Sequence, residues 1–105
     1  MLDTVGIQQL SREALVRGEE LRIARSHISG FLSDGRISFE EYERLDALFD
    51  EDHKKIDKIY RTAHKALTYH LDQVRPRIPF MPPAPAPTEE EERFLEASWS
   101  KIFSI

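Results

Sequence analysis

The chain has 105 residues, which is enough for one small domain and a tail. Hydrophobic residues make up 40% and charged residues 32%, an ordinary globular composition that argues against a fully disordered chain. The formal charge is -4, from 15 basic and 19 acidic residues, and this acidity makes nucleic-acid binding an unfavoured function. Because the chain has no cysteine, disulfides, thiolate metal sites and a cysteine nucleophile are excluded.

The start of the chain, Met1–Thr4, has neither the basic segment nor the apolar run of a secretory signal. No apolar run elsewhere is long enough to cross a bilayer. We therefore expect a cytoplasmic protein that does not bind membranes.

The first predicted helix lies within residues 1–37, where apolar residues recur at three- and four-residue steps. These residues are Leu10, Ala14, Leu21, Ala24, Ile28 and Phe31. Gly18 lies inside this stretch, where glycine costs about 1 kcal/mol relative to alanine, so we expect a neighbouring helix to approach closely there. Gly35 suits the left-handed backbone conformation that ends a helix.

The second predicted helix begins with a capping box at Ser38–Glu41 and ends before Pro76. At roughly 36 residues it is about 55 Å long, and one side is apolar throughout. A short break at Asp50–Asp52 is an alternative, because three acidic residues interrupt the apolar side there. Charge is divided along this segment: residues 38–52 carry a net of -6 and residues 53–77 a net of +5.

The first helix is expected to span about 25 residues, so the second should extend beyond it by roughly 15–20 Å. The apolar residues on that overhang are Ala63, Leu67, Leu71 and Val74. We expect either the C-terminal helix or a second subunit to cover them, which favours a homodimer or higher oligomer.

All six prolines fall in residues 76–87, which predicts a stiff polyproline II spacer. Thr88–Glu91 is a second capping box, and it opens an amphipathic helix over residues 88–105. The apolar face of this helix is made of Leu95, Trp99, Ile102 and Phe103. So short a helix is marginal in water alone, so these residues are the predicted partner-binding surface, buried on this chain, a sister chain or another protein.

A stripe of five basic residues lies opposite the apolar side of the second helix. It consists of Lys54, Lys55, Lys58, Arg61 and Lys65. A solvated face is the simplest interpretation, and the alternatives are docking of an acidic partner surface, of the acidic part of a second copy of the same helix, or of a phosphate-bearing ligand.

Asp50, His53, Asp57 and His64 lie within about 60° of arc on one edge of the same helix. Helical bundles build metal sites from such carboxylates and imidazoles, and the segment Asp50–Ile56 is locally similar to the first histidine segment of hemerythrins. Surface ion pairs are the competing interpretation, because carboxylates four residues from a histidine commonly form them. A metal site shared between two chains remains the alternative, and no other cofactor is expected.

These patterns together predict an all-α fold: a helical hairpin with one long helix over 1–75, a Pro-rich spacer over 76–87 and a C-terminal amphipathic docking helix over 88–105. The predicted function is that of a small, acidic, non-enzymatic interaction module, either an adaptor, an inhibitor or an assembly factor. Its partners are itself and another protein, and small binders of this kind are frequent in phages and bacterial accessory systems. A helical metal-binding protein and an oligomer that sequesters a phosphate-bearing ligand are the alternatives.

Overall fold

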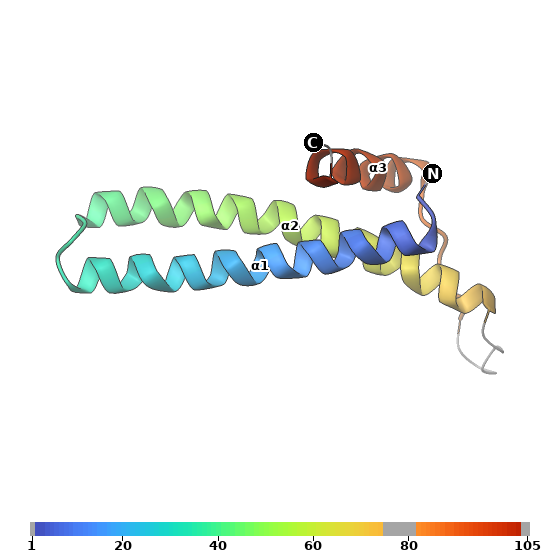
Figure 1. Ribbon diagram of the computed structural model, residues 1–105, viewed down its shortest axis with the longest axis horizontal. Helices are drawn as coiled ribbons and strands as arrows, with labels where there is room; N and C mark the ends of the chain where they lie inside the picture. The colour runs from blue at the N-terminus through green and yellow to red at the C-terminus, as the bar shows by residue number, and fades with distance from the viewer. Residues whose placement is uncertain (1, 75–81, 104–105) are drawn as a thin grey trace.

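A computed structural model shows that the protein is all-α, which confirms the predicted fold class. The structure describes residues 2–74 and 82–103, and within them it has three helices and no strand. The helices are α1 (Thr4–Ser33), α2 (Phe39–Val74) and α3 (Glu89–Phe103). α1 and α2 lie antiparallel and side by side, and α3 lies over one end of this pair (Figure 1).

α1 ends in a tight turn that Gly35 makes possible. Gly35 has a φ of 73°, in the left-handed region that L side chains rarely adopt. The Arg36 amide donates to the carbonyl of Phe31 at 2.9 Å, and the Gly35 amide donates to the carbonyl of Leu32 at 3.1 Å. These two bonds form a Schellman motif, so the predicted left-handed stop at Gly35 is confirmed.

The predicted capping box stands at the start of α2. The Glu41 amide donates to the Ser38 hydroxyl at 3.1 Å, and that hydroxyl donates to the Glu41 carboxylate at 3.2 Å. α2 then continues unbroken through Asp50–Asp52 to Val74, so the alternative of a break there is wrong. No glycine or proline interrupts the segment, and the three acidic side chains reach solvent or basic neighbours without disturbing the backbone ladder.

The predicted overhang of about 15–20 Å is also wrong. α1 has 30 residues because it begins at Thr4, where the Asp3 carboxylate accepts a hydrogen bond from the Gly6 amide at 2.8 Å. Its first turns therefore reach alongside Ala63, which is fully buried. Of the four residues assigned to the overhang, Leu71 and Val74 stay exposed, so only part of the apolar surface expected to need an oligomer is covered within the chain.

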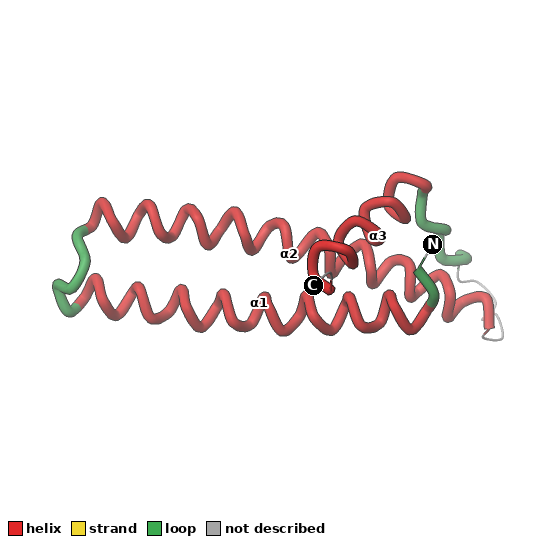
Figure 2. The backbone as a smooth tube through the Cα atoms, turned by 45° about the horizontal axis from the view of Figure 1, so that its top comes forward, coloured by secondary structure: helices red, strands yellow, loops and turns green. Residues whose placement is uncertain are grey.

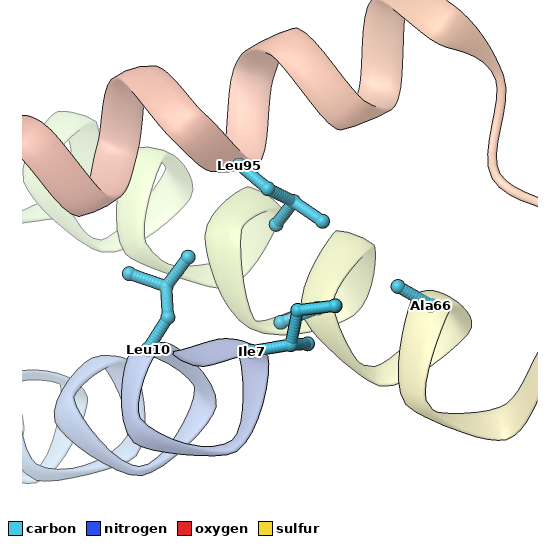
Figure 3. Close-up of a cluster of buried hydrophobic side chains, with 5 residues drawn as sticks. Ile7, Leu10, Ala66 and Leu95 are labelled. Atoms are coloured by element: carbon cyan, nitrogen blue, oxygen red, sulfur yellow. The ribbon is translucent and has the colours of Figure 1, made fainter. Parts of the chain in front are cut away.

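The core lies where all three helices meet, at the end of the molecule that holds the start of α1 and the end of α2 (Figures 1 and 2). Its buried members are Ile7, Leu10, Ala63, Ala66 and Leu95, four of which are labelled in Figure 3. The two alanines belong to α2, and their small side chains let α1 and α3 pack close to its backbone.

The other end of the molecule consists of α1, α2 and their connecting turn (Figure 2). Ile28 is the one hydrophobic side chain of this end, among the described residues, that is fully buried. Large apolar side chains such as Phe31, Phe39 and Leu48 are exposed there. A pair of helices has too little surface to enclose them, so this end has two open faces.

Candidate functional site

The capping box at the start of α3 fixes where this helix begins and therefore which side chains form its apolar face. The Glu91 amide donates to the Thr88 hydroxyl at 3.1 Å, and the Glu91 carboxylate accepts from the Thr88 amide at 2.9 Å, which completes the predicted capping box. Four glutamates, Glu89 to Glu92, occupy the first turn, where the positive end of the helix dipole favours them.

The four residues predicted to bind a partner pack mainly against their own chain. Leu95 is only 2% exposed, and Trp99 and Ile102 pack against the same buried cluster. The rings of Trp99 and Phe103 lie 4.3 Å apart, and Phe103 stays partly exposed at the end of the helix. The apolar face of α3 thus belongs mainly to the core of its own chain.

All five residues of the basic stripe have neighbours that compensate their charge or contact them. Three form ion pairs with carboxylates one turn earlier on α2: Lys54 with Asp50, Lys55 with Glu51, and Arg61 with Asp57. The other two hold α3, since Lys65 binds Glu91 at 2.8 Å and the Lys58 ammonium lies 4.5 Å from the centre of the Phe94 ring. The stripe is therefore largely occupied within the chain.

Glu91 joins the capping box to the stripe. The Lys65 ammonium and, next, the Thr88 amide stabilise its charged form and hold the pKa of Glu91 below its ordinary value of 4.5. This one carboxylate therefore stabilises both the first turn of α3 and its contact with α2.

The four candidate metal ligands do not gather in one place. Asp50 pairs with Lys54 at 3.1 Å, and Asp57 pairs with Arg61 at 2.9 Å. The His64 ring stacks on Tyr60 instead of facing His53. Within residues 2–74 and 82–103, no three His, Cys, Asp or Glu side chains are close enough to hold a metal ion.

An open groove of about 390 Å³ runs between α1 and α2 near the middle of the molecule. Its apolar lining consists of Ala14, Leu15, Leu21, Phe49, Ile56 and Tyr60. His53 and Asp57, two of the predicted metal ligands, contribute to its α2 wall, and Arg22 and Arg25 to its α1 wall. An apolar floor with a charged rim is typical of a protein-binding surface.

The groove and α3 occupy opposite faces of the α1–α2 pair. α3 approaches α2 at Lys58 and Lys65, and a second hollow, between these two helices, is lined by Thr62. Tyr60 of the groove is two residues from both Lys58 and Thr62, which is 200° around a helix. The groove is therefore on the face that α3 leaves uncovered.

Gly18 forms part of the groove wall. A Cβ built on Gly18 would have Ile56 Cγ2 as its nearest neighbour, at 3.9 Å, which is ordinary van der Waals contact. The expected close approach of a neighbouring helix is thus absent within the described chain. Among the residues that the structure describes, none requires a glycine at this position, although glycine weakens the helix.

An ion-pair fork fixes the end of the groove nearest the turn. Arg25 donates to both carboxylate oxygens of Asp46, at 2.6 and 3.0 Å, and lies 3.9 Å from Asp50. The hydrogen bond lowers the pKa of Asp46 below its usual 3.8 and raises that of Arg25. This fork joins α1 to α2 and sets the spacing of the two walls.

The sequence indicated the α2 wall of this groove but not its α1 wall. The arc of Asp and His residues interpreted as metal ligands marks the α2 wall, and Phe49 and Tyr60 belong to the predicted apolar side of that helix. The α1 wall could not be assigned, because it depends on which residues of α1 stand opposite Phe49, Ile56 and Tyr60.

Comparison of the chain with protein-family models, with curated proteins and with solved structures gave no match. None of the helices in the described part of the chain combines the length and the apolarity needed to cross a membrane.

Proposed function

We propose that the protein is a non-enzymatic interaction module, acting as an adaptor, inhibitor or assembly factor, and that the groove between α1 and α2 is its binding surface. The observation that carries this proposal is the position of the groove: it lies on the face of the α1–α2 pair opposite α3. An uncovered apolar groove between two helices fits a helical or extended partner segment.

In this proposal the helical hairpin 1–75 carries the binding surface. The Pro-rich segment 76–87 is a spacer that returns the chain, and the Ala84 amide near its end donates to the Asp72 carboxylate of α2 at 3.0 Å. Residues 76–81 of this spacer lie outside the described residues. α3 then covers one face of the hairpin. The groove therefore replaces Leu95 and Trp99 as the proposed partner-binding surface. The absence of cysteine suits a cytoplasmic location.

Two adjacent exposed residues of α1 provide a matched test. Leu15 is 56% exposed and lines the groove, whereas Val16 is 46% exposed and does not line it. The full chain, carrying an affinity tag, is isolated from its native host together with an untagged copy of the same chain, and stoichiometric partners are quantified by mass spectrometry.

We expect the unsubstituted chain and Val16→Glu to retain one partner, either another protein or the untagged copy, and Leu15→Glu to lose it. The reason is that the Leu15→Glu substitution places a charge in an apolar contact, which costs binding energy when buried. Recovery of the tagged chain alone would show that the function is wrong. Equal retention by the two glutamate variants would show that the groove is not the surface.

A further inference from the structure

We propose that the occupant of the groove is a second copy of this chain, packed antiparallel about a two-fold axis that passes near Gly18 and Ile56. This inference rests on the proposed function and names the partner for the same surface. Three independent features of the described residues support it: the symmetry of the groove, the distribution of charge along α2, and the unexplained glycine.

The groove is arranged symmetrically along α2. Phe49 and Tyr60 line its two ends and are 11 residues apart, which is about 16 Å along the helix and only about 20° around it. In an antiparallel two-fold pairing, each contact occurs twice, so Phe49 of one copy lies against Tyr60 of the other. The midpoint of this pair falls between Lys54 and Lys55, about 2 Å along the helix from Ile56, which is the residue nearest to Gly18 across the α1–α2 contact.

The charge of α2 reverses close to the same midpoint. Within the helix, residues 39–52 carry a net of -6 and residues 53–74 a net of +3. An antiparallel copy places the acidic half of each α2 level with the basic half of the other, whereas a parallel copy places like charges level with one another. Lys58 and Lys65 contact α3, so the remaining basic residues of α2 carry this complementarity. A different protein would need a helix whose charges run in the opposite order to those of α2. An antiparallel copy of α2 presents its charges in that order.

One pair of residues beside the groove expresses this complementarity: Asp50 lies 3.9 Å from Arg25 and Arg61 lies 2.9 Å from Asp57, and Arg25 and Asp57 both line the groove. Asp50 and Arg61 are also 11 residues apart, so they share an edge of α2, and in the second copy each is within about 3 Å, along the helix, of the level of the other. Both side chains reach solvent, with 46% and 79% exposed. Their present partners, Lys54 and Asp57, lie one turn away in surface pairs of small energy, so an intermolecular pair can replace them.

Gly18 supplies the third feature. Glycine in a helix interior is unfavourable, and no atom of residues 2–74 and 82–103 is close enough to exclude a Cβ at this position. Close approach of a second α1 at the two-fold axis provides the reason that the single chain lacks. The glycine would then let the two α1 backbones cross in contact.

The charge pair gives the decisive experiment, with Asp50→Arg and Arg61→Asp prepared as two full-length variants. We expect the unsubstituted chain to sediment at twice its mass of 12.3 kDa. Each variant alone faces two like-charge contacts in its homodimer, so its dimer dissociation constant should rise at least about tenfold. An equimolar mixture has two opposite-charge contacts, so native mass spectrometry should show the heterodimer as the main species. Circular dichroism confirms that each variant is as helical as the parent.

The glycine gives a second readout that does not depend on charge. Gly18→Ala should raise the melting temperature of the monomer by a few degrees and raise the dimer dissociation constant about tenfold, because the added methyl occupies the crossing point. Gly30→Ala is the matched control: Gly30 also lies in α1, is exposed and has no atom within 4 Å of a built Cβ. This control should raise the melting temperature and leave dimerisation unchanged.

Several outcomes would overturn the inference. If the unsubstituted chain is a monomer at every concentration, while Leu15→Glu still abolishes capture of a different protein, the groove has another occupant and the proposed function stands. A dimer that persists in Asp50→Arg, or variants that fail to associate when mixed, would mean that the copies meet through another surface. An unchanged dimer in Gly18→Ala would exclude the crossing at that residue.

Discussion

At the scale of single residues, Glu91 shows how one side chain can serve two helices. Its backbone amide and carboxylate complete the capping box with Thr88, and the same carboxylate binds Lys65 of α2. On the far side of α2, Asp46 plays a similar part by receiving two hydrogen bonds from Arg25 of α1. The fold thus depends on a few carboxylates that must be ionised.

Glu91 predicts a specific dependence of stability on pH. Its folded pKa is below 4.5, so the unfolded chain binds a proton at higher pH than the folded chain does. Its stabilising contribution is therefore complete above pH of about 4.5 and is lost as the pH falls through the folded pKa. We expect Glu91→Gln to flatten the decline in free energy of unfolding in this acidic range, as measured by urea unfolding at a series of pH values.

Glu90→Gln is the control for this experiment, because Glu90 is exposed in the same first turn and glutamine also preserves helix propensity. Glutamine at position 91 keeps a carbonyl oxygen that can still accept the Thr88 amide, so the cap is retained. The same pH profile in both variants would contradict the role assigned to the Glu91 carboxylate.

Leu95 tests whether α3 contributes to the stability of the chain. Leu95→Ala removes a side chain that is 2% exposed from the buried cluster, and we expect a loss of about 2–5 kcal/mol in the free energy of unfolding. Val16→Ala, at a residue 46% exposed, should cost less than about 1 kcal/mol. If chemical denaturation shows the same small loss in the free energy of unfolding for both variants, α3 does not pack on its own chain in solution.

At the scale of the elements, the start of every described helix and the end of α1 are explained by contacts within a few residues. Asp3 caps α1, Ser38 caps α2 and Thr88 caps α3. Gly35 ends α1 because its left-handed conformation lets the next two amides reach back to the last turn.

Two glycines at the end of α1 should respond oppositely to alanine. Gly35→Ala forces a Cβ into the left-handed region and should lower the free energy of unfolding by about 1 kcal/mol. Gly30→Ala lies in helical backbone with open space around it and should raise the free energy of unfolding by up to about 1 kcal/mol. Thermal or urea unfolding of both variants measures the difference, and changes of the same sign would contradict the backbone conformation at Gly35.

At the scale of the whole molecule, the two ends differ in how many helices share the core. The end that includes α3 has a buried cluster drawn from three helices, whereas the end with the turn has two helices and open faces (Figure 1). Stability is therefore distributed unevenly along α1 and α2, although each is a single continuous helix.

Hydrogen exchange should reveal this gradient. We expect the slowest backbone amides around Ile7, Leu10, Ala63 and Ala66, and faster exchange in the part of α1 and α2 that flanks Gly35. A dimer formed through the groove would add protection near Gly18 and Ile56 that disappears on dilution. Uniform protection along both helices would contradict the uneven core.

The sequence by itself determined the helical class and those helix boundaries that depend on local hydrogen bonds. The capping boxes at Ser38 and Thr88 and the stop at Gly35 could be predicted because each depends on hydrogen bonds between residues at most five apart. The bipolar charge of α2 could likewise be counted directly from the chain. The same reasoning gave the first helix about 25 residues, whereas α1 has 30, because its apolar pattern begins at Leu10, well after the Asp3 cap.

Only the tertiary structure decided how the helices fit together. The register that sets Gly18 beside Ile56 creates the groove, and the packing of Leu95 with Ile7 turns the expected docking face of α3 into core. Both results depend on contacts between residues that are tens of positions apart. Hydrophobic packing is non-directional, so the apolar residues identify which faces are to be buried but leave open which of the available surfaces will cover them.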